Sequence, residues 1–525
     1  MMPRITLRTC RKISQIFFLF LFLLLFRLTD YSGLDEIPYA VNIFFRWDPL
    51  IAATVLLAAK TYISLLLPSL VILILTLVFG RLFCGWICPM GTLLDCAGKV
   101  INPLPQTNYS LRSVKYILLA VILISSLFGL QLVGFFDPLS ILVRGMTLAV
   151  DPVFNLIISG FFDPIYHYAP EWLSNTTEPV YTILKDSVLP HQQSFFKLSS
   201  LSGFILITII ALEKLDRRFW CRNLCPLGAL LALFARFSFY RRFPGIACND
   251  CQHCAPSCRM NAFDTKSGYI RHEECNLCMD CVDYCINQPS RFSFSMPRNQ
   301  LPVDISRRTF VGAALAGFSL PLLSKVNAQH LLPSPALLRP PGAVGGTEFF
   351  SKCVRCGECM KVCIQNALQP CFIESGYEGM FTPKLIPRFG YCEFNCTLCG
   401  QVCPTGAIRK LSQPEKNTFV IGIALIDEQR CLPFADLSPC IVCEEHCPTH
   451  DKAIKFKKVA VINRNGESIE LRQPYVITEL CIGCGICENK CPLSGHSAIR
   501  VLNNTMSAEE DLSEYGSYNE SDAKI

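Results

Sequence analysis

Cysteines in regular runs are the residues of this sequence whose spacing indicates chemistry. Two runs between residues 248 and 285 follow the pattern C-x2-C-x2-C-x3-C. Such a run wraps a short loop around one face of a 4Fe–4S cube, and its fourth cysteine ligates the neighbouring cube. The runs are Cys248, Cys251, Cys254 and Cys258, and Cys275, Cys278, Cys281 and Cys285. We therefore expect one cube on Cys248, Cys251, Cys254 and Cys285, and a second on Cys258, Cys275, Cys278 and Cys281.

Four further runs follow residue 350. Two keep the regular spacing, namely Cys353, Cys356, Cys359 and Cys363, and Cys481, Cys484, Cys487 and Cys491. Two are less regular, namely Cys392, Cys396, Cys399 and Cys403, and Cys431, Cys440, Cys443 and Cys447. Six quartets in total predict about six 4Fe–4S clusters, which carry out one-electron transfer.

Other cysteine chemistries fit this spacing less well. Zinc sites favour two CxxC pairs separated by a long gap. Disulfides are plausible for exported cysteines, but a three-residue repeat suits a cluster loop better than bridges between distant strands. No C-x-x-C-H haem attachment motif and no Gly-rich dinucleotide fingerprint occur. The pattern thus favours iron–sulfur electron transfer over haem, flavin or nicotinamide chemistry.

A different cysteine motif occurs twice in the first half of the chain. Cys84 and Cys88 lie in CGWICPMGTLL, and Cys221 and Cys225 lie in CRNLCPLGALL. Each follows an apolar segment and a basic residue, which indicates two related halves. Three interpretations remain open: the thiols shape helix ends, form redox dithiol pairs, or supply four ligands to one extra metal centre.

The elements that must position these motifs are largely apolar. Of the 525 residues, 51% are hydrophobic and only 17% are charged, whereas soluble domains carry about 25% charge. The net charge of +6 is too small to argue for nucleic-acid binding. Four segments approach the length of a membrane span, namely 13–28, 62–79, 116–136 and 198–212. Segments 51–59 and 139–162 are interrupted by Asp, Arg or Pro, and we expect them along the outer interface or re-entering the membrane.

Basic residues cluster before the first predicted span, between the second and third, and after the fourth. By the positive-inside rule the N-terminus and both Cys-x3-Cys-Pro motifs are cytoplasmic. Asp-Pro pairs after aromatic residues then lie on the outer side, at Asp48, Asp137 and Asp163. An Asp-Pro pair is also a common helix start, so helix capping is the alternative to a proton-handling role.

Residues 306–311, Ser-Arg-Arg-Thr-Phe-Val, precede a short apolar segment and have the features of an internal twin-arginine export signal. The alternative is a fifth membrane anchor preceded by a chance Arg pair. Val326–Ala328 is a possible cleavage site. Either interpretation places the following residues outside the cytoplasm, after a Pro- and Gly-rich linker at 331–346.

The predicted fold class is an α-helical membrane domain with about four transmembrane helices, joined to two α+β ferredoxin-like domains. The expected domains are a transmembrane domain at 1–240 and a cytoplasmic two-cluster ferredoxin domain at 241–300. A signal or anchor with its linker follows at 301–348, then a periplasmic four-cluster domain at 349–505 and an acidic, disordered tail at 506–525.

The combined motifs resemble two families joined end to end. Residues 1–300 resemble the NapH-type membrane ferredoxin through FCGWICPMG, WCRNLCPLG and the runs at Cys248 and Cys275. Residues 306–500 resemble the NapG-type exported polyferredoxin through SRRTFV, YCEFNCTLCGQVCPTGAI and ELCIGCGICENKCP. Fusion departs from the usual two separate subunits. In related four-cluster subunits the first run exchanges its last cysteine with the fourth run, and the second run with the third.

The resemblance implies a quinol dehydrogenase component of the bacterial inner membrane. Electrons from the quinone pool would leave to a periplasmic reductase, such as nitrate reductase, or to a cytochrome. Quinol oxidation releases protons, so Asp48, Asp137 and Asp163 are the candidate catalytic acids. Two alternatives are an electron-relay subunit without its own quinol site and a membrane assembly factor for a respiratory metalloenzyme, although such factors usually lack a four-cluster exported domain.

Overall fold

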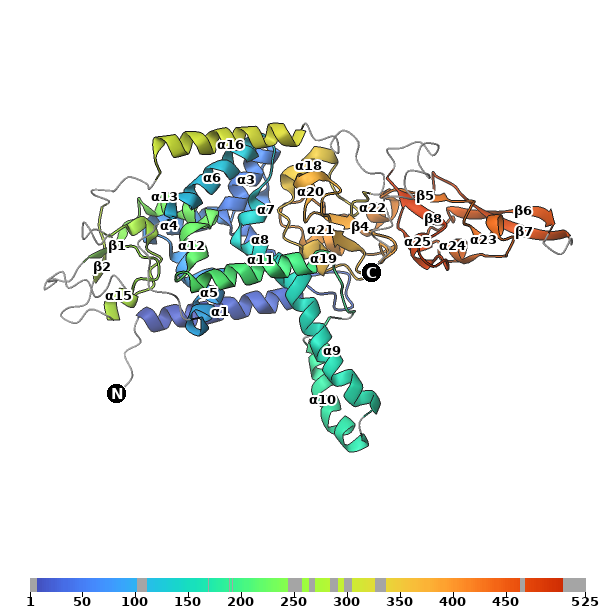
Figure 1. The fold of residues 1–525 in the computed structure, drawn as a ribbon, viewed down its shortest axis with the longest axis horizontal. Coiled ribbons are helices and arrows are strands. Elements are labelled where there is room, and N and C mark those ends of the chain that lie inside the picture. Colours follow the sequence, from blue (N-terminus) through green and yellow to red (C-terminus); the bar gives the residue numbers. More distant parts are fainter. Residues whose placement is uncertain are drawn as a thin grey trace.

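The computed structural model describes residues 7–101, 111–168, 170–187, 189–190, 192–243, 257–263, 270–283, 291–296, 305–325, 337–462 and 468–503. Three parts follow one another along the long axis of Figure 1. A small region with strands β1 and β2 is at one end, a helical bundle is in the middle, and a cysteine-rich part is at the other end. Four predicted cluster ligands lie outside the described residues, as do the possible cleavage site and the acidic tail. These ligands are Cys248, Cys251, Cys254 and Cys285.

The helical bundle is built from the first 235 residues together with a later helix, α16. Its helices are α1 (Leu7–Leu28), α2 (Ile43–Arg46), α3 (Pro49–Ala59), α4 (Ser69–Phe79), α5 (Pro89–Val100), α6 (Arg112–Leu127), α7 (Val133–Phe136), α8 (Pro138–Gly145), α9 (Asp151–Tyr168), α10 (Glu171–Ser187), α11 (Ser199–Ala211), α12 (Phe219–Asn223), α13 (Pro226–Ala235) and α16 (Arg307–Lys325). Several begin with Pro in the first turn, where its missing N–H leaves no helical bond unmade.

Two helices in the described part of the chain are long and apolar enough to cross a membrane. One is Leu7–Leu28, which matches the first predicted span. The other runs without interruption from Pro138 to Tyr168. The helix therefore continues through Arg144, Asp151 and Pro152, which were expected to interrupt segment 139–162, and whether it spans a membrane stays a prediction. At the other three predicted spans the helices α4, α6 and α11 are shorter, so four transmembrane helices are not shown.

Helices α9 and α10 form a hairpin that projects from the bundle, across the direction of α1, α11 and α16 (Figure 1). The surface of the hairpin carries many exposed apolar side chains, including Phe154, Phe161 and Trp172. The proposed location of this segment along an interface stays a prediction.

Helix α16 contains the twin-arginine-like segment and lies alongside α6 (Figure 1). A Cβ atom placed on Gly317 would approach Cβ of Ile124 to 2.9 Å, so the glycine permits close packing of the two helices. Ser125 of α6 donates a hydrogen bond to the carbonyl oxygen of Gly317 at 3.1 Å. This integration into the bundle favours the anchor interpretation of the segment.

The cysteine-rich part consists of short helices and two-stranded antiparallel sheets. Its helices are α18 (Gly346–Lys352), α19 (Glu358–Lys361), α20 (Gly376–Gly379), α21 (Leu398–Val402), α22 (Gln413–Thr418), α23 (Leu432–Ala435), α24 (Val442–Glu445) and α25 (Ile486–Lys490). Its strands are β3 (Leu368–Pro370), β4 (Pro383–Leu385), β5 (Ile423–Ile426), β6 (Ile454–Ile462), β7 (Ser468–Val476) and β8 (Ile499–Leu502). The pairs are β3–β4, β5–β8 and β6–β7. Cysteines form part of its buried core, as expected for a fold organised around clusters.

The smaller ferredoxin-like part contains β1 (Tyr240–Phe243), α15 (Asp280–Asp283) and β2 (Arg291–Phe294). Tyr240 pairs with Phe294 in the antiparallel β1–β2 sheet, and the aromatic side chain of Phe79, at the end of α4, packs on both. This part therefore lies directly against the bundle.

Candidate iron–sulfur centres

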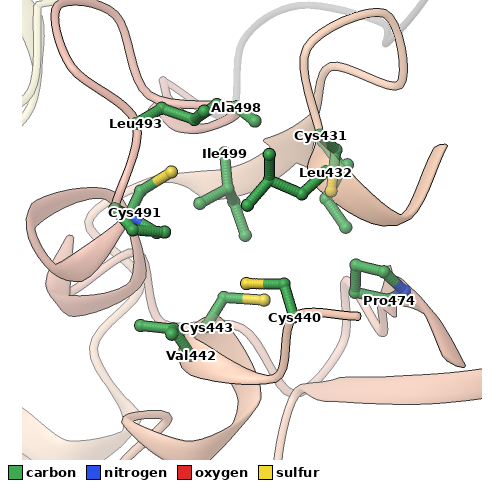
Figure 2. A pocket seen from close by; sticks show the side chains of 12 residues that line it. Cys431, Leu432, Cys440, Val442, Cys443, Pro474, Cys491, Leu493, Ala498 and Ile499 are labelled. Carbon is green, nitrogen blue, oxygen red and sulfur yellow. The ribbon is translucent and has the colours of Figure 1, made fainter. Parts of the chain in front are cut away.

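Four cysteines surround a cavity at the far end of the cysteine-rich part. Figure 2 shows the thiols of Cys431, Cys440, Cys443 and Cys491 entering this cavity from different sides. Three come from the third run, and Cys491 is the last cysteine of the fourth run. Apolar side chains such as Leu432 and Ile499 line the rest of the cavity. We call this set quartet 4.

A second cavity has the same character. It is lined by the first three cysteines of the second run and by the last cysteine of the first run: Cys392, Cys396, Cys399 and Cys363. We call this set quartet 2. Both cavities combine four thiols with an apolar lining, which suits a cube that is bound at four corners and shielded from water.

The remaining cysteines of this part form two complementary sets. The thiols of Cys353, Cys356 and Cys359 each lie close enough to Cys403 for their charges to interact, which we call electrostatic range. The four cysteines form quartet 1. Cys481 and Cys484 each lie within electrostatic range of Cys447, and with Cys487 they form quartet 3. Every predicted ligand after residue 350 thus belongs to a set of four.

The exchange of cysteines differs from the one implied by the family resemblance. That pairing of the first run with the fourth and of the second with the third is wrong for this structure. The first run exchanges its last cysteine with the second run, and the third with the fourth. The reason is packing, since α19 of the first run contacts α21 of the second, and α24 of the third contacts α25 of the fourth.

The four quartets lie in series. Quartets 2 and 3 are joined by a backbone hydrogen bond, in which the N–H of Cys392 donates to the carbonyl oxygen of Cys484 at 2.9 Å. Cys487 of quartet 3 lies within electrostatic range of Cys443 of quartet 4. Cys359 of quartet 1 lies within range of Cys399 of quartet 2. The order along the molecule is therefore quartet 1, 2, 3 and 4, with quartet 1 at the bundle.

The surroundings of the thiols fit bound iron. Burial raises the pKa of Cys363 and of Cys443 to about 11, so these thiols would ionise at neutral pH only next to strong positive charge. Iron supplies such charge, because a thiol that coordinates a metal is deprotonated. Backbone N–H groups also donate to sulfur, from Ile408 to Cys403 and from Ala424 to Cys481, each at 3.4 Å. Bonds of this kind tune cluster potentials.

The run at Cys275 is only partly described. Cys275 and Cys278 lie within electrostatic range of Cys258, the last cysteine of the preceding run. The Sγ atom of Cys258 accepts a hydrogen bond from the N–H of Ala262 at 3.3 Å. This juxtaposition agrees with the predicted exchange of Cys258 into the second quartet. Three of the ligands predicted for the partner quartet belong to residues 244–256, outside the described ranges.

The two Cys-x3-Cys-Pro motifs come together in the bundle. Cys88, Cys221 and Cys225 are buried, and each lies within electrostatic range of Cys84. The Sγ atom of Cys225 accepts a hydrogen bond from the N–H of Gly228 at 3.2 Å. Within the described ranges, no three His, Cys, Asp or Glu side chains converge on a single metal ion. What the four gathered thiols do, as structural, redox or ligating groups, stays a prediction.

Two buried arginines each contact the motif opposite to their own. Arg81 precedes Cys84 by the same spacing with which Arg218 precedes Cys221. The Arg218 guanidinium donates to the carbonyl oxygens of Cys84 and Gly91 in the other motif, each at 3.0 Å. Reciprocally, Nη2 of Arg81 lies against Gly228, where an added Cβ would be 2.7 Å away. From the sequence, only a basic residue was expected before each motif, although the repeated spacing R-x2-C-x3-C-P-x-G was a detectable signal.

The first motif also contacts the cysteine run that begins at Cys275 directly. A Cβ on Gly85 would lie 2.0 Å from the carbonyl oxygen of Asn276, which follows Cys275. The indole N–H of Trp86 donates to the carbonyl oxygen of Leu277 at 3.1 Å. Arg81 forms a buried ion pair with Glu274 at 3.0 Å. The two cysteine sites are therefore held in close contact.

The three candidate acids separate into a pair and a single residue. The carboxyl groups of Asp48 and Asp137 are fully buried and lie within hydrogen-bonding range of each other. Asp163 lies elsewhere, on the projecting hairpin, where its Oδ1 accepts a hydrogen bond from the Tyr181 hydroxyl at 2.7 Å in an exposed position. Only Asp48 and Asp137 are brought together.

Comparisons with known proteins agree with this organisation. A family model described as "4Fe-4S binding domain" matches residues 61–108 and 196–246, which contain the two Cys-x3-Cys-Pro motifs. A second model with the same description matches residues 349–369 and 474–493, which contain the first and fourth runs of the cysteine-rich part. No solved structure shows a significant match.

Curated relatives resemble parts of the chain. The ferredoxin-type protein NapG of Escherichia coli is 35% identical over 37% of this chain and 81% of its own length. The methylamine utilization ferredoxin-type protein MauM of Methylorubrum extorquens is 36% identical over 38% of this chain and 90% of its own. The putative electron transport protein YccM of E. coli is 28% identical over 47% of this chain and 57% of its own.

Quartets of cysteines in series, matched by two 4Fe–4S models, define an iron–sulfur electron-transfer protein. Within that class, the chain belongs to the family of NapG and MauM ferredoxin-type proteins.

Proposed function

We propose that this protein spans the bacterial inner membrane, oxidises quinol and passes electrons through its outer quartets to a periplasmic redox protein. The main support for placing the protein in the membrane is the position of helix α1, whose two ends contact different cysteine sites. At its start Arg8 pairs with Asp280 of the cytoplasmic cysteine run at 3.1 Å. Two residues beyond its end, Asp30 pairs with Lys361, next to quartet 1, at 2.7 Å. Its 22 residues extend about 33 Å, roughly the thickness of the hydrocarbon core.

Quartet 1 is built into the bundle, which supports electron entry from the membrane. Val354 and Cys356 belong to the same buried apolar core as Leu50 and Leu139 of helices α3 and α8. A Cβ on Gly134 of α7 would lie 2.3 Å from the carbonyl oxygen of Val354. When bound there, a 4Fe–4S cluster supplies one-electron transfer. The chain positions it at the outer end of the bundle.

The proposed topology places both Cys-x3-Cys-Pro motifs and residues 241–300 on the cytoplasmic side, and residues 349–505 on the periplasmic side. Helix α16 supports this arrangement, because it runs beside α6 from the end with β2 to the end with α18 (Figure 1). We assign α16 as an anchor that stays in the mature protein. The four thiols of the motifs then hold an extra centre that connects the bundle to the cytoplasmic clusters.

Quartet 4 is the proposed exit. It is the last quartet in the series, and the β6–β7 hairpin extends beside it at the end of the molecule furthest from the bundle (Figure 1). Pro474 of β7 lines its cavity. A periplasmic reductase or cytochrome that docks at this end would receive electrons from quartet 4.

The proposal is tested with the purified protein, kept anaerobic in lipid nanodiscs. Short-chain naphthoquinol and ubiquinol are added separately, and cluster reduction is followed by loss of the visible iron–sulfur absorption. We expect at least one quinol to reduce the clusters. Reduction by dithionite but by neither quinol would contradict the proposal and favour a relay subunit whose quinol site lies in a partner.

A further inference from the structure

The Asp48–Asp137 pair has an arrangement that helix capping alone does not explain. Each residue caps a helix with one oxygen. Oδ1 of Asp48 accepts from the N–H of Leu50 at 2.7 Å, and Oδ2 of Asp137 accepts from the N–H of Ser140 at 2.7 Å. Within the described part of the chain, the other oxygen of each carboxyl group, Oδ2 of Asp48 and Oδ1 of Asp137, is buried and accepts no hydrogen bond from an N–H or O–H group.

The two carboxyl groups lie close enough to interact directly. Two carboxylates are both acceptors, so a hydrogen bond between them requires a proton. Two like charges buried side by side would also be costly, and such dyads hold one proton between them. The pair therefore holds one proton and retains one free site for another.

The pair is close to quartet 1. Arg144 follows Asp137 by two turns of helix and lies within electrostatic range of Asp137, Cys353 and Cys356. Its Nη1 donates to the carbonyl oxygen of Gly134 at 2.7 Å and to that of Arg355 at 3.1 Å. Arg355 in turn donates to the carbonyl oxygen of Gln131 at 2.5 Å. One guanidinium thus links the acid pair to the loop that carries the first ligands of quartet 1.

We propose that Asp48 and Asp137 share one proton and together form the proton acceptor for quinol oxidation at the outer end of the bundle, beside quartet 1. This inference rests on the proposed function. Arg144 is a positioning residue, which fixes α7 and α8 against the loop Cys353–Cys356. Asp163 has no part in the reaction.

Quinol is oxidised in two steps, and each step releases one proton and one electron. One quinol O–H bond breaks, its proton moves to the free carboxylate site of the pair, and its electron leaves to the one-electron acceptor that a 4Fe–4S cluster held by quartet 1 would supply. The pair then releases a proton toward the outer side, and the second O–H bond breaks in the same way. The products are a quinone, two protons outside and two electrons in the quartets.

The test compares Asp48→Asn and Asp137→Asn with Asp163→Asn. Asparagine keeps the helix cap and its amide can donate to the remaining carboxylate, so the fold is preserved. Asp163 is a matched control because it lies in a similar Phe-Phe-Asp-Pro string but is exposed. We expect the two buried variants to lower the rate of quinol-driven reduction on the order of 100-fold. Iron content and reduction by dithionite stay at wild-type values, and Asp163→Asn behaves like wild type.

A second measurement needs no quinol. The infrared difference between the resting protein in H2O and in D2O reports the C=O stretch of a protonated carboxyl group. We expect such a band in the wild type and in Asp163→Asn, and its loss in both buried variants. A wild type without the band, or buried variants that keep the wild-type rate, would overturn the inference. If no quinol reduces the wild type but the band is present, the proposed function fails while the shared proton stands.

Discussion

At the scale of single residues, the chain uses the same device twice to bring distant cysteines together. Arg81 and Arg218 are almost fully buried, and each reaches from its own motif to the other. Buried guanidinium groups require partners, which Glu274 and Asp95 supply at 3.0 and 2.8 Å. The acids and arginines thereby fix four thiols beside the cysteine run that begins at Cys275.

The four thiols give the first prediction. We expect Cys88→Ser or Cys225→Ser to remove the extra centre, because a serine hydroxyl is a poor cluster ligand. Iron should fall by about four atoms per chain, and quinol should no longer reduce the cytoplasmic clusters while it still reduces quartets 1 to 4. Metal analysis and electron paramagnetic resonance check this. Cys96→Ser, an exposed cysteine, is the control. Unchanged iron and unchanged reduction would assign the motifs to helix-end structure only.

The sequence predicted residue types better than it predicted partners. Spacing predicted the cysteines that the structure gathers into quartets 1 to 4, and it predicted the repeated Cys-x3-Cys-Pro motif of the bundle. It did not predict which runs exchange their last cysteine, because that depends on the packing of α19 on α21 and of α24 on α25. Similarly, Asp48, Asp137 and Asp163 share an Asp-Pro string, but only the fold decides that two of them meet. Arg144 and Arg355 belong to no recognisable sequence motif, so their contacts could not be predicted.

At the scale of elements, close helix and loop contacts join the three parts of the molecule. At α7, the contact of Gly134 with Val354 leaves no room for a side chain. The extent of the apolar helices was harder to predict, because hydropathy alone does not show where a helix begins. Asp137 and Pro138 begin a helix, as the capping alternative predicted, and this helix continues through Arg144, Asp151 and Pro152, where an interruption was expected.

The α7 contact gives the second prediction. Gly134→Ala forces the loop of quartet 1 away from the bundle, since overpacking of this kind costs about 1–3 kcal/mol. We expect quinol-driven reduction of quartets 1 to 4 to slow at least about tenfold while dithionite still reduces them, as stopped-flow absorption would show. Gly160→Ala, with open space around its Cβ, should match the wild type. Equal rates in both variants would mean that this contact does not set electron entry.

The third prediction concerns α16. Gly317→Leu places a side chain where α16 meets Ile124, so it should lower the free energy of unfolding by about 1–3 kcal/mol. Thermal denaturation in detergent measures the loss. Gly312→Leu is the control, because an added Cβ at Gly312 meets nothing within 4 Å. If the two variants have the same stability, or if the mature protein lacks α16, the segment is a removable signal rather than an anchor.

At the scale of the whole molecule, the described cysteine runs lie on both sides of the bundle, in the part with β1 and β2 and in the part with α18 to α25, which Figure 1 shows at opposite ends of the bundle. In the proposed topology, the bundle separates the cytoplasmic cysteine runs from the four outer quartets in series. Because quartet 1 shares the core of the bundle, the outer part is not a flexibly tethered domain. A chain that joins both parts needs no docking step between separate subunits before electrons leave the membrane.

The fourth prediction is the metal content of the intact chain. Six ferredoxin-type quartets should hold about 24 iron and about 24 acid-labile sulfide per chain, and the extra centre would add about four of each. Anaerobic iron and sulfide analysis of freshly purified protein checks the number. A stable preparation with about eight iron atoms or fewer would rule out clusters throughout the outer part.

The central claim is that electrons from quinol enter at quartet 1 and reach quartet 4 through quartets 2 and 3. Electron paramagnetic resonance of anaerobic protein, frozen after reaction with quinol, tests it in Cys356→Ser and Cys440→Ser, which break quartet 1 and quartet 4 respectively. We expect that quinol reduces no outer quartet in Cys356→Ser, although dithionite reduces those that remain, and that quinol still reduces quartets 1 to 3 in Cys440→Ser. Wild-type reduction of quartets 2 to 4 by quinol in Cys356→Ser would contradict it.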